Sequence, residues 1–178
     1  MKIFAETEHL ILREIVVADT GDMFELDSNP EVHEYLGKRP IFCMHKARVY
    51  VDYIRMQYDK YGIGRWAAIE KKSGAWIGWT GLKMNFEEEM NGHQNYYDIG
   101  YRFKPRYWGK GYATESSIAA RDYFFENFPN QKLCGLAEVE NKASCRVLEK
   151  IGLARKADFY YEAEDCMIAW FESYGVTP

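Results

Sequence analysis

The sequence predicts a single mixed α/β domain in which an antiparallel sheet continues into a strand–helix–strand unit. The chain has 178 residues, of which 47% are apolar, so it can bury a sizeable core without a second domain. Residues 65–70 and 75–84 are two strand patterns joined by a short polar turn, as in a β-hairpin. Residues 96–103 and 133–139 are two more strand patterns, separated by a glycine-rich turn and a helix pattern. We therefore predict one domain over residues 1–178.

The first half of the chain contains one further strand pattern and two helix patterns. Residues 9–15 form a strand pattern, and Asp19 or Thr20 is a suitable N-cap for a helix that continues through Leu26. Residues 44–61 carry apolar side chains at steps of three or four, which place one apolar stripe on a helix. The stripe consists of Ala47, Val51, Ile54 and Tyr58.

The second half of the chain predicts two helices and three strands after the glycine-rich turn. Residues 112–127 have the apolar spacing of a helix that covers a sheet. Residues 133–139 are almost continuously apolar, as in a strand that is covered on both faces. A second helix pattern covers residues 141–152, and residues 154–161 and 165–171 then predict a final pair of strands.

Charge and hydropathy exclude several classes of function. A formal net charge of -4 and the absence of a long basic run argue against a protein that binds nucleic acid. The N-terminus does not resemble a signal peptide, and no apolar run is long enough to span a membrane. We therefore expect a cytoplasmic protein without a membrane partner. The acidic run at residues 87–89 is either a solvated loop or a collar that attracts a cationic substrate such as an amine.

Cysteine and histidine are spaced too irregularly to predict a metal site. The four cysteines lack C-x-x-C spacing, and we expect them to be reduced packing residues: Cys43, Cys134, Cys145 and Cys166. The four histidines likewise show no H-x-x-x-H pairing: His9, His33, His45 and His93. The sequence therefore predicts chemistry without a metal.

The glycine-rich turn at residues 106–113 predicts phosphate binding. Gly109 and Gly111 flank Lys110, so the turn can expose several backbone N–H groups immediately before a helix N-terminus. Arg106 adds a second positive charge. The turn matches neither the Walker pattern, since Gly111 follows Lys110, nor G-x-G-x-x-G. A diphosphate other than those of the common nucleotide motifs is therefore indicated.

Two ordered blocks of the chain resemble the GNAT superfamily of N-acetyltransferases. Residues 106–113, RYWGKGYA, resemble its coenzyme A pyrophosphate loop, and their surroundings look like the ribosomal-protein N-acetyltransferase (RimJ/RimL) branch. Residues 141–153, NKASCRVLEKIGL, resemble the second conserved block of the same enzymes. The resemblance implies a twisted, mostly antiparallel sheet of about six or seven strands, flanked by helices. Its central parallel strands, here residues 96–103 and 133–139, would splay apart around the pantetheine arm.

The same resemblance implies an acetyl-CoA-dependent N-acetyltransferase that transfers the acetyl group directly to a primary amine in a ternary complex. The acceptor would be a protein N-terminus or a small-molecule amine, and the chain a monomer or a homodimer. The coenzyme would be bound by the end of the first strand, the turn, the following helix start and the second block. These residues are Tyr101, Arg102, Phe103, Arg106, Trp108, Gly109, Lys110, Gly111, Tyr112, Ala113, Thr114, Asn141, Ser144 and Leu148.

The catalytic residues implied by the resemblance are Ser144 and Asp98. Much of the superfamily has a tyrosine that protonates the leaving thiolate where this chain has Leu148. The resemblance to RimJ/RimL-like enzymes, in the pattern Asn141-x-x-Ser144, instead implies a serine hydroxyl near the coenzyme sulfur, so we assign Ser144 as the proton donor or as a hydrogen-bond partner of the thiolate. Ser144 can alternatively serve only to cap or pack its helix. Asp98 occupies a position where relatives often have a glutamate base, but it can equally be structural. Glu162, Glu164 or a chain of waters remain alternatives as the base.

Two other functions fit parts of the pattern. Because Leu148 replaces the usual tyrosine, the chain can be an acyl-CoA-binding sensor without transferase activity. The glycine turn alone is compatible with a nucleotide-binding protein. Binding of acetyl-CoA and release of its thiol distinguish these alternatives.

Overall fold

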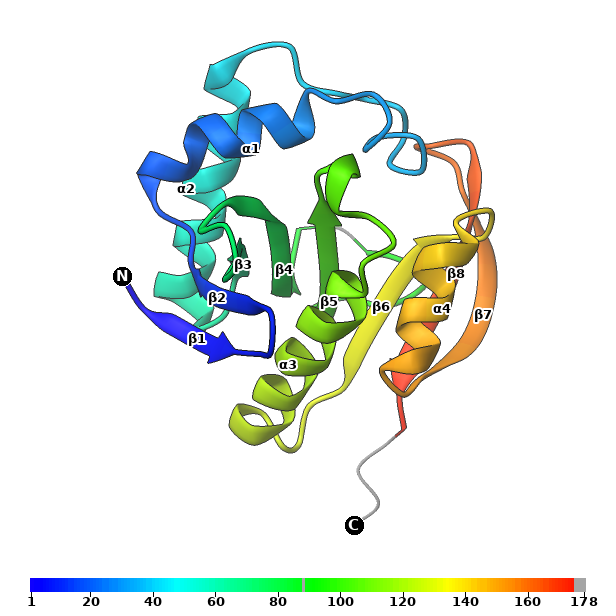
Figure 1. Cartoon of the computed structure of the whole chain (residues 1–178). Helices are drawn as coiled ribbons and strands as arrows, with labels where there is room; N and C mark the ends of the chain where they lie inside the picture. Colours follow the sequence, from blue (N-terminus) through cyan, green and yellow to red (C-terminus); the bar gives the residue numbers. More distant parts are fainter. Residues whose placement is uncertain (88, 175–178) are drawn as a thin grey trace.

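The computed structural model describes residues 1–87 and 89–174, which form one eight-stranded sheet with helices on both faces (Figure 1). The strands are β1 (Ile3–Glu6), β2 (Leu10–Glu14), β3 (Arg65–Glu70), β4 (Trp76–Asn85), β5 (Tyr96–Phe103), β6 (Leu133–Glu138), β7 (Leu153–Tyr161) and β8 (Cys166–Ser173). The α-helices of the described residues are α1 (Thr20–Asp27), α2 (Met44–Tyr61), α3 (Tyr112–Asn127) and α4 (Lys142–Lys150). Two short 3-10 helices are η1 (Val17–Asp19) and η2 (Pro105–Tyr107).

The strand order in the sheet is β1-β2-β3-β4-β5-β6-β8-β7, and β5 and β6 are its parallel pair. These strands run in the same direction because α3 carries the chain back between them. The other neighbouring strands of the described sheet are antiparallel. The parallel pair therefore lies in the interior of the sheet, where helices cover it.

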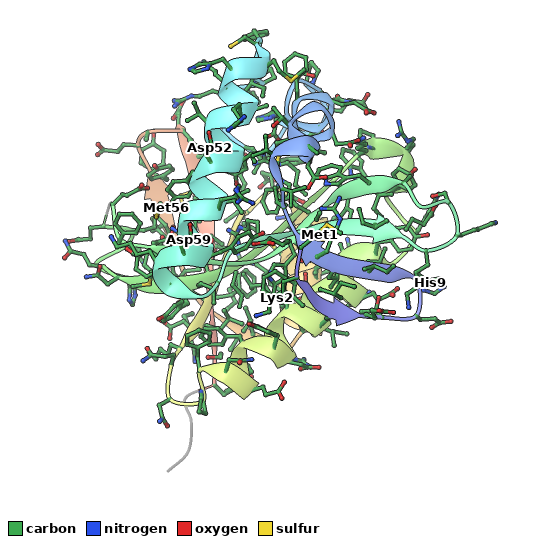
Figure 2. All side chains as sticks on the ribbon, turned by 90° about the vertical axis from the view of Figure 1, so that its left-hand side faces the viewer. Met1, Lys2, His9, Asp52, Met56 and Asp59 are labelled. Atoms are coloured by element: carbon green, nitrogen blue, oxygen red, sulfur yellow. The ribbon has the colours of Figure 1, made fainter. Side chains whose placement is uncertain are left out.

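The sheet separates two apolar cores. On one face α3 and α4 pack over the sheet, and Phe124 of α3 shares a core with Trp66 of β3. On the other face α1 and α2 pack over the sheet, and Val51 of α2 shares a core with Ala67 of β3. Trp66 and Ala67 are neighbours in one strand, so their side chains enter opposite cores. Figure 2 shows α2 in front of the sheet, with Asp52 on its outer side.

The predicted fold class is confirmed, with one more strand than the upper end of the expected range. β1 is the strand that the sequence patterns miss, because it is a four-residue strand at the edge of the sheet. The predicted helices at residues 44–61 and 112–127 coincide with α2 and α3. Two predictions extend beyond the described residues. The predicted acidic run includes Glu88, and the predicted domain includes residues 175–178.

Candidate active site

The parallel strands β5 and β6 separate halfway along their length (Figure 1). Their ladder contains only three residue pairs, the last of which is Ile99 with Gly135. Beyond that point β5 stays paired with β4 as far as Phe103, and β6 stays paired with β8 as far as Glu138. The divergence therefore opens the sheet at its centre while each strand keeps its outer partner.

The glycine-rich turn directly after β5 has a backbone geometry that is suited to bind an anion. Gly109 and Gly111 have φ of +73° and +86°, conformations that glycine adopts without the strain of a Cβ atom. A Cβ at either position would meet no atom within 4 Å, so the space in front of the turn is open. Within the described residues, the backbone N–H groups of residues 109–114 have no hydrogen-bond acceptor. Consecutive unpaired amides at a helix N-terminus are suited to bind a diphosphate.

Basic and aromatic side chains surround this turn. Lys110 places its ammonium 4.9 Å from the centre of the Tyr107 ring. Arg106 is exposed and pairs with Glu25 of α1 at 3.1 Å, so a bound anion would compete with that carboxylate. The Trp108 indole donates a hydrogen bond to the Phe103 carbonyl at 2.7 Å, which ties the turn to the end of β5.

The first residues of α3 offer backbone groups to the turn. The Tyr112 side chain points away from it and donates a hydrogen bond to Glu70 at 2.7 Å, a bond that raises the pKa of Tyr112 to about 12. Its backbone N–H remains unpaired, like those of Ala113 and Thr114, within the described residues. For Tyr112, the group that is free to contact a coenzyme is therefore its backbone amide, and the predicted coenzyme contacts of Ala113 and Thr114 stay predictions.

Ser144 and Tyr101 meet beside the opened strands. The Ser144 hydroxyl, in the first turn of α4, lies 2.9 Å from the phenol oxygen of Tyr101 on β5. Burial raises the pKa of Tyr101, and the hydrogen bond from Ser144 partly opposes that rise. The phenol is therefore protonated at neutral pH. Either hydroxyl of the pair can donate its proton to the other or to a bound group.

Asn141 and Leu148 hold α4 in place. The Asn141 side chain accepts a hydrogen bond from the backbone N–H of Ser144 at 3.0 Å, so Asn141 is the N-cap of α4. Leu148 is 3% exposed and faces Gly135 of β6, where an added Cβ would come within 2.6 Å of the leucine. The glycine thus lets α4 approach β6 closely, next to the point where β6 leaves β5.

Asp98 forms a largely buried ion pair with Arg65 of β3. The Arg65 guanidinium lies 2.9 Å from one Asp98 oxygen and 3.1 Å from the other, and the two side chains are 8% and 17% exposed. Arg65 also donates a hydrogen bond to the Gly81 carbonyl of β4. This geometry gives Asp98 a structural role across three strands, and its assignment as the base stays a prediction.

Replacing Asp98 by asparagine is expected to lower the free energy of unfolding by about 3 kcal/mol, because Arg65 would keep a buried charge without its partner. The midpoint of urea unfolding measures the loss. Asp52→Asn is the matched control, since it removes an exposed ion pair with Arg48 on the outer side of α2 (Figure 2) and should cost about 0.5 kcal/mol or less. Equal losses in the two variants would contradict the structural role of Asp98.

The second face of β5 borders a cavity of about 520 Å³. It is open to solvent and is lined by the end of α1, the segment that follows, α2, β4 with the loop after it, and β5. Its lining residues are Asp27, His33, Ile41, Lys46, Val49, Tyr50, Tyr53, Lys83, Glu87 and Arg102. Arg102 and Asp27 form an ion pair of 2.6 Å across it. Because neighbouring residues alternate between faces, Arg102 faces this cavity while Tyr101 faces α4.

The sequence patterns miss two features of this region. The Tyr101 hydroxyl lies beside Ser144 because β5 contacts α4, and these two residues are 43 positions apart in the chain. The cavity on the other face combines side chains from two helices, two loops and two strands, so no local pattern reveals it.

The described residues contain neither a metal-binding cluster nor a membrane-spanning helix. No cluster of three or more histidine, cysteine, aspartate or glutamate side chains in residues 1–87 and 89–174 is arranged to bind a metal ion. None of the helices in that part of the chain is both long enough and apolar enough to cross a membrane.

Comparison with known proteins identifies relatives of this arrangement. Residues 9–154 match the family model described as an acetyltransferase (GNAT) domain. The Bacillus subtilis (strain 168) protein YkkB is 33% identical over 148 residues, which are 83% of each chain.

Solved acetyltransferases share the fold at low sequence identity. The ribosomal L7/L12 alpha-N-protein acetyltransferase RimL in complex with coenzyme A has a TM-score of 0.80 at 15% identity, with 98% of each chain covered. The spermidine N-acetyltransferase from Vibrio cholerae in complex with CoA and spermine has a TM-score of 0.71 at 18% identity. That match covers 92% of this chain and 94% of the other.

Proposed function

The chain belongs to the acetyltransferase (GNAT) family, and from that premise we propose that it transfers an acetyl group from acetyl-CoA directly to a primary amine. Acetyl-CoA, the acetyl donor of this family, supplies a thioester whose carbonyl carbon is open to attack by an amine. The observation that carries the proposal is the opened β5–β6 pair, which leads into a turn of unpaired amides. A diphosphate fits the turn, and the opening is suited to the extended arm attached to it.

The residues proposed to hold the coenzyme lie along one continuous path. The amides of residues 109–114 would bind the diphosphate, and Lys110 would add positive charge. The backbone of β5 beyond Ile99 no longer pairs with β6, so its edge is available to the amide groups of the arm and to the acetyl oxygen. Asn141 and Ser144, at the start of α4, lie on the other side of the opening.

The Tyr101–Ser144 pair is proposed to hold the proton that the departing thiolate needs. A thiol has a pKa of about 8.5, so modest help from a hydroxyl donor is sufficient. Many relatives have a proton-donating tyrosine in α4, at the position where this chain has Leu148. We propose that the phenol of Tyr101, which lies on β5, supplies the proton instead. The absence of a tyrosine at position 148 therefore does not by itself favour a sensor without activity.

The cavity beside Arg102 is proposed as the acceptor site, because it borders β5 on the face opposite the Tyr101–Ser144 pair. Its described lining contains three cations, Lys46, Lys83 and Arg102, against the two carboxylates of Asp27 and Glu87. A polyamine would require an excess of negative charge. The lining therefore argues against a polyamine, and we propose as acceptor the N-terminal amine of a peptide or an amino acid derivative.

Two measurements on the pure protein test the proposal. Calorimetry with acetyl-CoA should detect binding in preference to ATP. Thiol release should then depend on an added amine, chosen from a panel of peptide amides with free N-termini, lysine derivatives and polyamines. Binding without thiol release for any amine would favour the acyl-CoA sensor, and preference for ATP would favour the nucleotide-binding alternative.

A further inference from the structure

Arg102 presents a guanidinium group to the proposed acceptor site. Its side chain lines the cavity and is 18% exposed, although it belongs to β5, the strand whose edge is proposed to bind the coenzyme. Tyr101 and Arg102 face opposite sides of the sheet, as neighbouring residues of a strand do. The coenzyme contact predicted for Arg102 therefore falls to its backbone, and its side chain is available to the acceptor.

Two neighbours hold the Arg102 guanidinium in a fixed position. Asp27, the last residue of α1, accepts a hydrogen bond from Arg102 Nη1 at 2.6 Å, and its side chain is only 6% exposed. Trp79 stands opposite Arg102 in the β4–β5 ladder, and its ring centre lies 5.2 Å from the Arg102 Cζ atom. Since Nε is buried, the donors that a ligand can reach are on the two terminal nitrogens. A planar donor group held in this way is preorganised for an oxygen ligand.

The charges of the cavity favour a ligand oxygen with full or partial negative charge. The described lining contains three cations, Arg102 among them, against two carboxylates. A guanidinium only donates hydrogen bonds, so it repels an ammonium group and binds carboxylate or carbonyl oxygens. In an α-amino acid or a peptide N-terminus, the carbon that carries such an oxygen is two bonds from the amine nitrogen. An anchor for the oxygen therefore also restricts the position of the amine.

We infer that Arg102 is a specificity-determining residue that binds the oxygen on the carbon next to the amine-bearing carbon of the acceptor. The inference rests on the proposed function, and its basis in the structure is the fixed guanidinium that faces the acceptor cavity. An acceptor held there reaches the edge of β5 next to Tyr101, where the acetyl oxygen is proposed to lie. The acceptors are thus α-amino carboxylates or α-amino carbonyl compounds, and an alkylamine is a poor substrate. Asp27 is a positioning residue, since it acts through Arg102.

Three acceptors with the same side chain test the inference. They are the amino acid amide that the wild-type protein acetylates fastest, the free amino acid, and the alkylamine that lacks the carboxamide. Because their amines differ in basicity, each acceptor is compared only with itself across the variants. Arg102→Gln should lower kcat/KM for the amide and the amino acid by about 10- to 100-fold, mainly through KM, which corresponds to one lost hydrogen bond to a charged group. The value for the alkylamine should change by less than about 2-fold.

Two further variants separate the loss of the anchor from a folding defect. The double variant Asp27→Asn/Arg102→Gln removes both charges together, so no buried charge is left without a partner, and it should show the same selective loss. Arg48→Gln removes a cation on the outer side of α2 and should leave all three values unchanged. Equal losses for the three acceptors would indicate a structural role and would overturn the inference. A wild-type protein that prefers the alkylamine would also overturn it, and both results leave the proposed function intact.

The two oxygen sources and the transfer step are distinguished separately. A larger loss for the free amino acid than for the amide would identify a carboxylate as the bound group, and equal losses for these two would identify a carbonyl. Both outcomes support the anchor. NMR titration of the CoA-bound protein with the amide should show binding to the wild type and at least about 10-fold weaker binding to the double variant. Equal affinities, or no binding to the wild type, would contradict the anchor. If no amine causes thiol release while binding of the amide depends on Arg102, the proposed transfer fails and the anchor stands.

Discussion

Gly109→Glu is expected to weaken the binding of acetyl-CoA by at least about 100-fold. Gly109 has a φ of +73°, which a side chain strains, and its Cβ position faces the open space in front of the turn. A carboxylate there would repel a diphosphate and would itself accept hydrogen bonds from the unpaired amides. Losing two amide contacts worth about 1.5 kcal/mol each corresponds to about 100-fold in the dissociation constant. Calorimetry at constant ionic strength measures the effect.

Gly92→Glu provides a control for the general effect of the substitution. Gly92 has a φ of +75° and an equally open Cβ position, but it lies in the loop between β4 and β5. This variant carries the same added charge and the same backbone strain, and it should bind acetyl-CoA like the wild-type protein. Unchanged affinity in Gly109→Glu, or equal losses in both variants, would show that the turn does not bind the diphosphate.

Removing the Tyr101–Ser144 hydroxyl pair is expected to lower turnover without a comparable loss of coenzyme affinity. Tyr101→Phe and Ser144→Ala should each reduce kcat by about 100-fold, the lower end of what a positioned proton donor contributes. Because the two hydroxyls act together at 2.9 Å, the double variant should lose little more than the more impaired single variant. Steady-state thiol release gives kcat, and calorimetry gives the affinity for acetyl-CoA.

The pH dependence provides a second test of the pair. Burial raises the pKa of Tyr101, so the phenol should remain protonated to above its usual value of about 10. Turnover of the wild-type protein should therefore show no alkaline loss from this group below that pH. Tyr123→Phe, which removes a phenol from α3 beside Trp66, should leave kcat unchanged. Full activity in the double variant would exclude both hydroxyls as donors.

Local sequence patterns predict much of the fold because they report on single elements. The glycine at position 62 ends α2 with a φ of +69°, and Asn141 caps α4, as their residue types indicate. The separation of β5 and β6 is a property of two strands, and only the family resemblance anticipates it. β1 is missed because a short edge strand carries too little pattern to be distinguished from a loop.

Side-chain partners in the site are less predictable, because they come from distant parts of the chain. Asp98 carries a plausible pattern for a base, but its position relative to Arg65, 33 residues earlier, converts it into half of an ion pair. The side chain of Tyr112 turns to Glu70 and leaves only a backbone amide for the turn.

The central claim is that the turn after β5 and the opening between β5 and β6 together bind acetyl-CoA. Amide chemical shifts of the nitrogen-15-labelled protein, recorded during titration with acetyl-CoA, test it most directly. We predict large shifts for the unpaired amides of residues 109–114 and for the β5 residues beyond Ile99, with small shifts for the β1–β2 hairpin at the sheet edge. Saturation with acetyl-CoA that leaves the signals of residues 109–114 unmoved would contradict the claim.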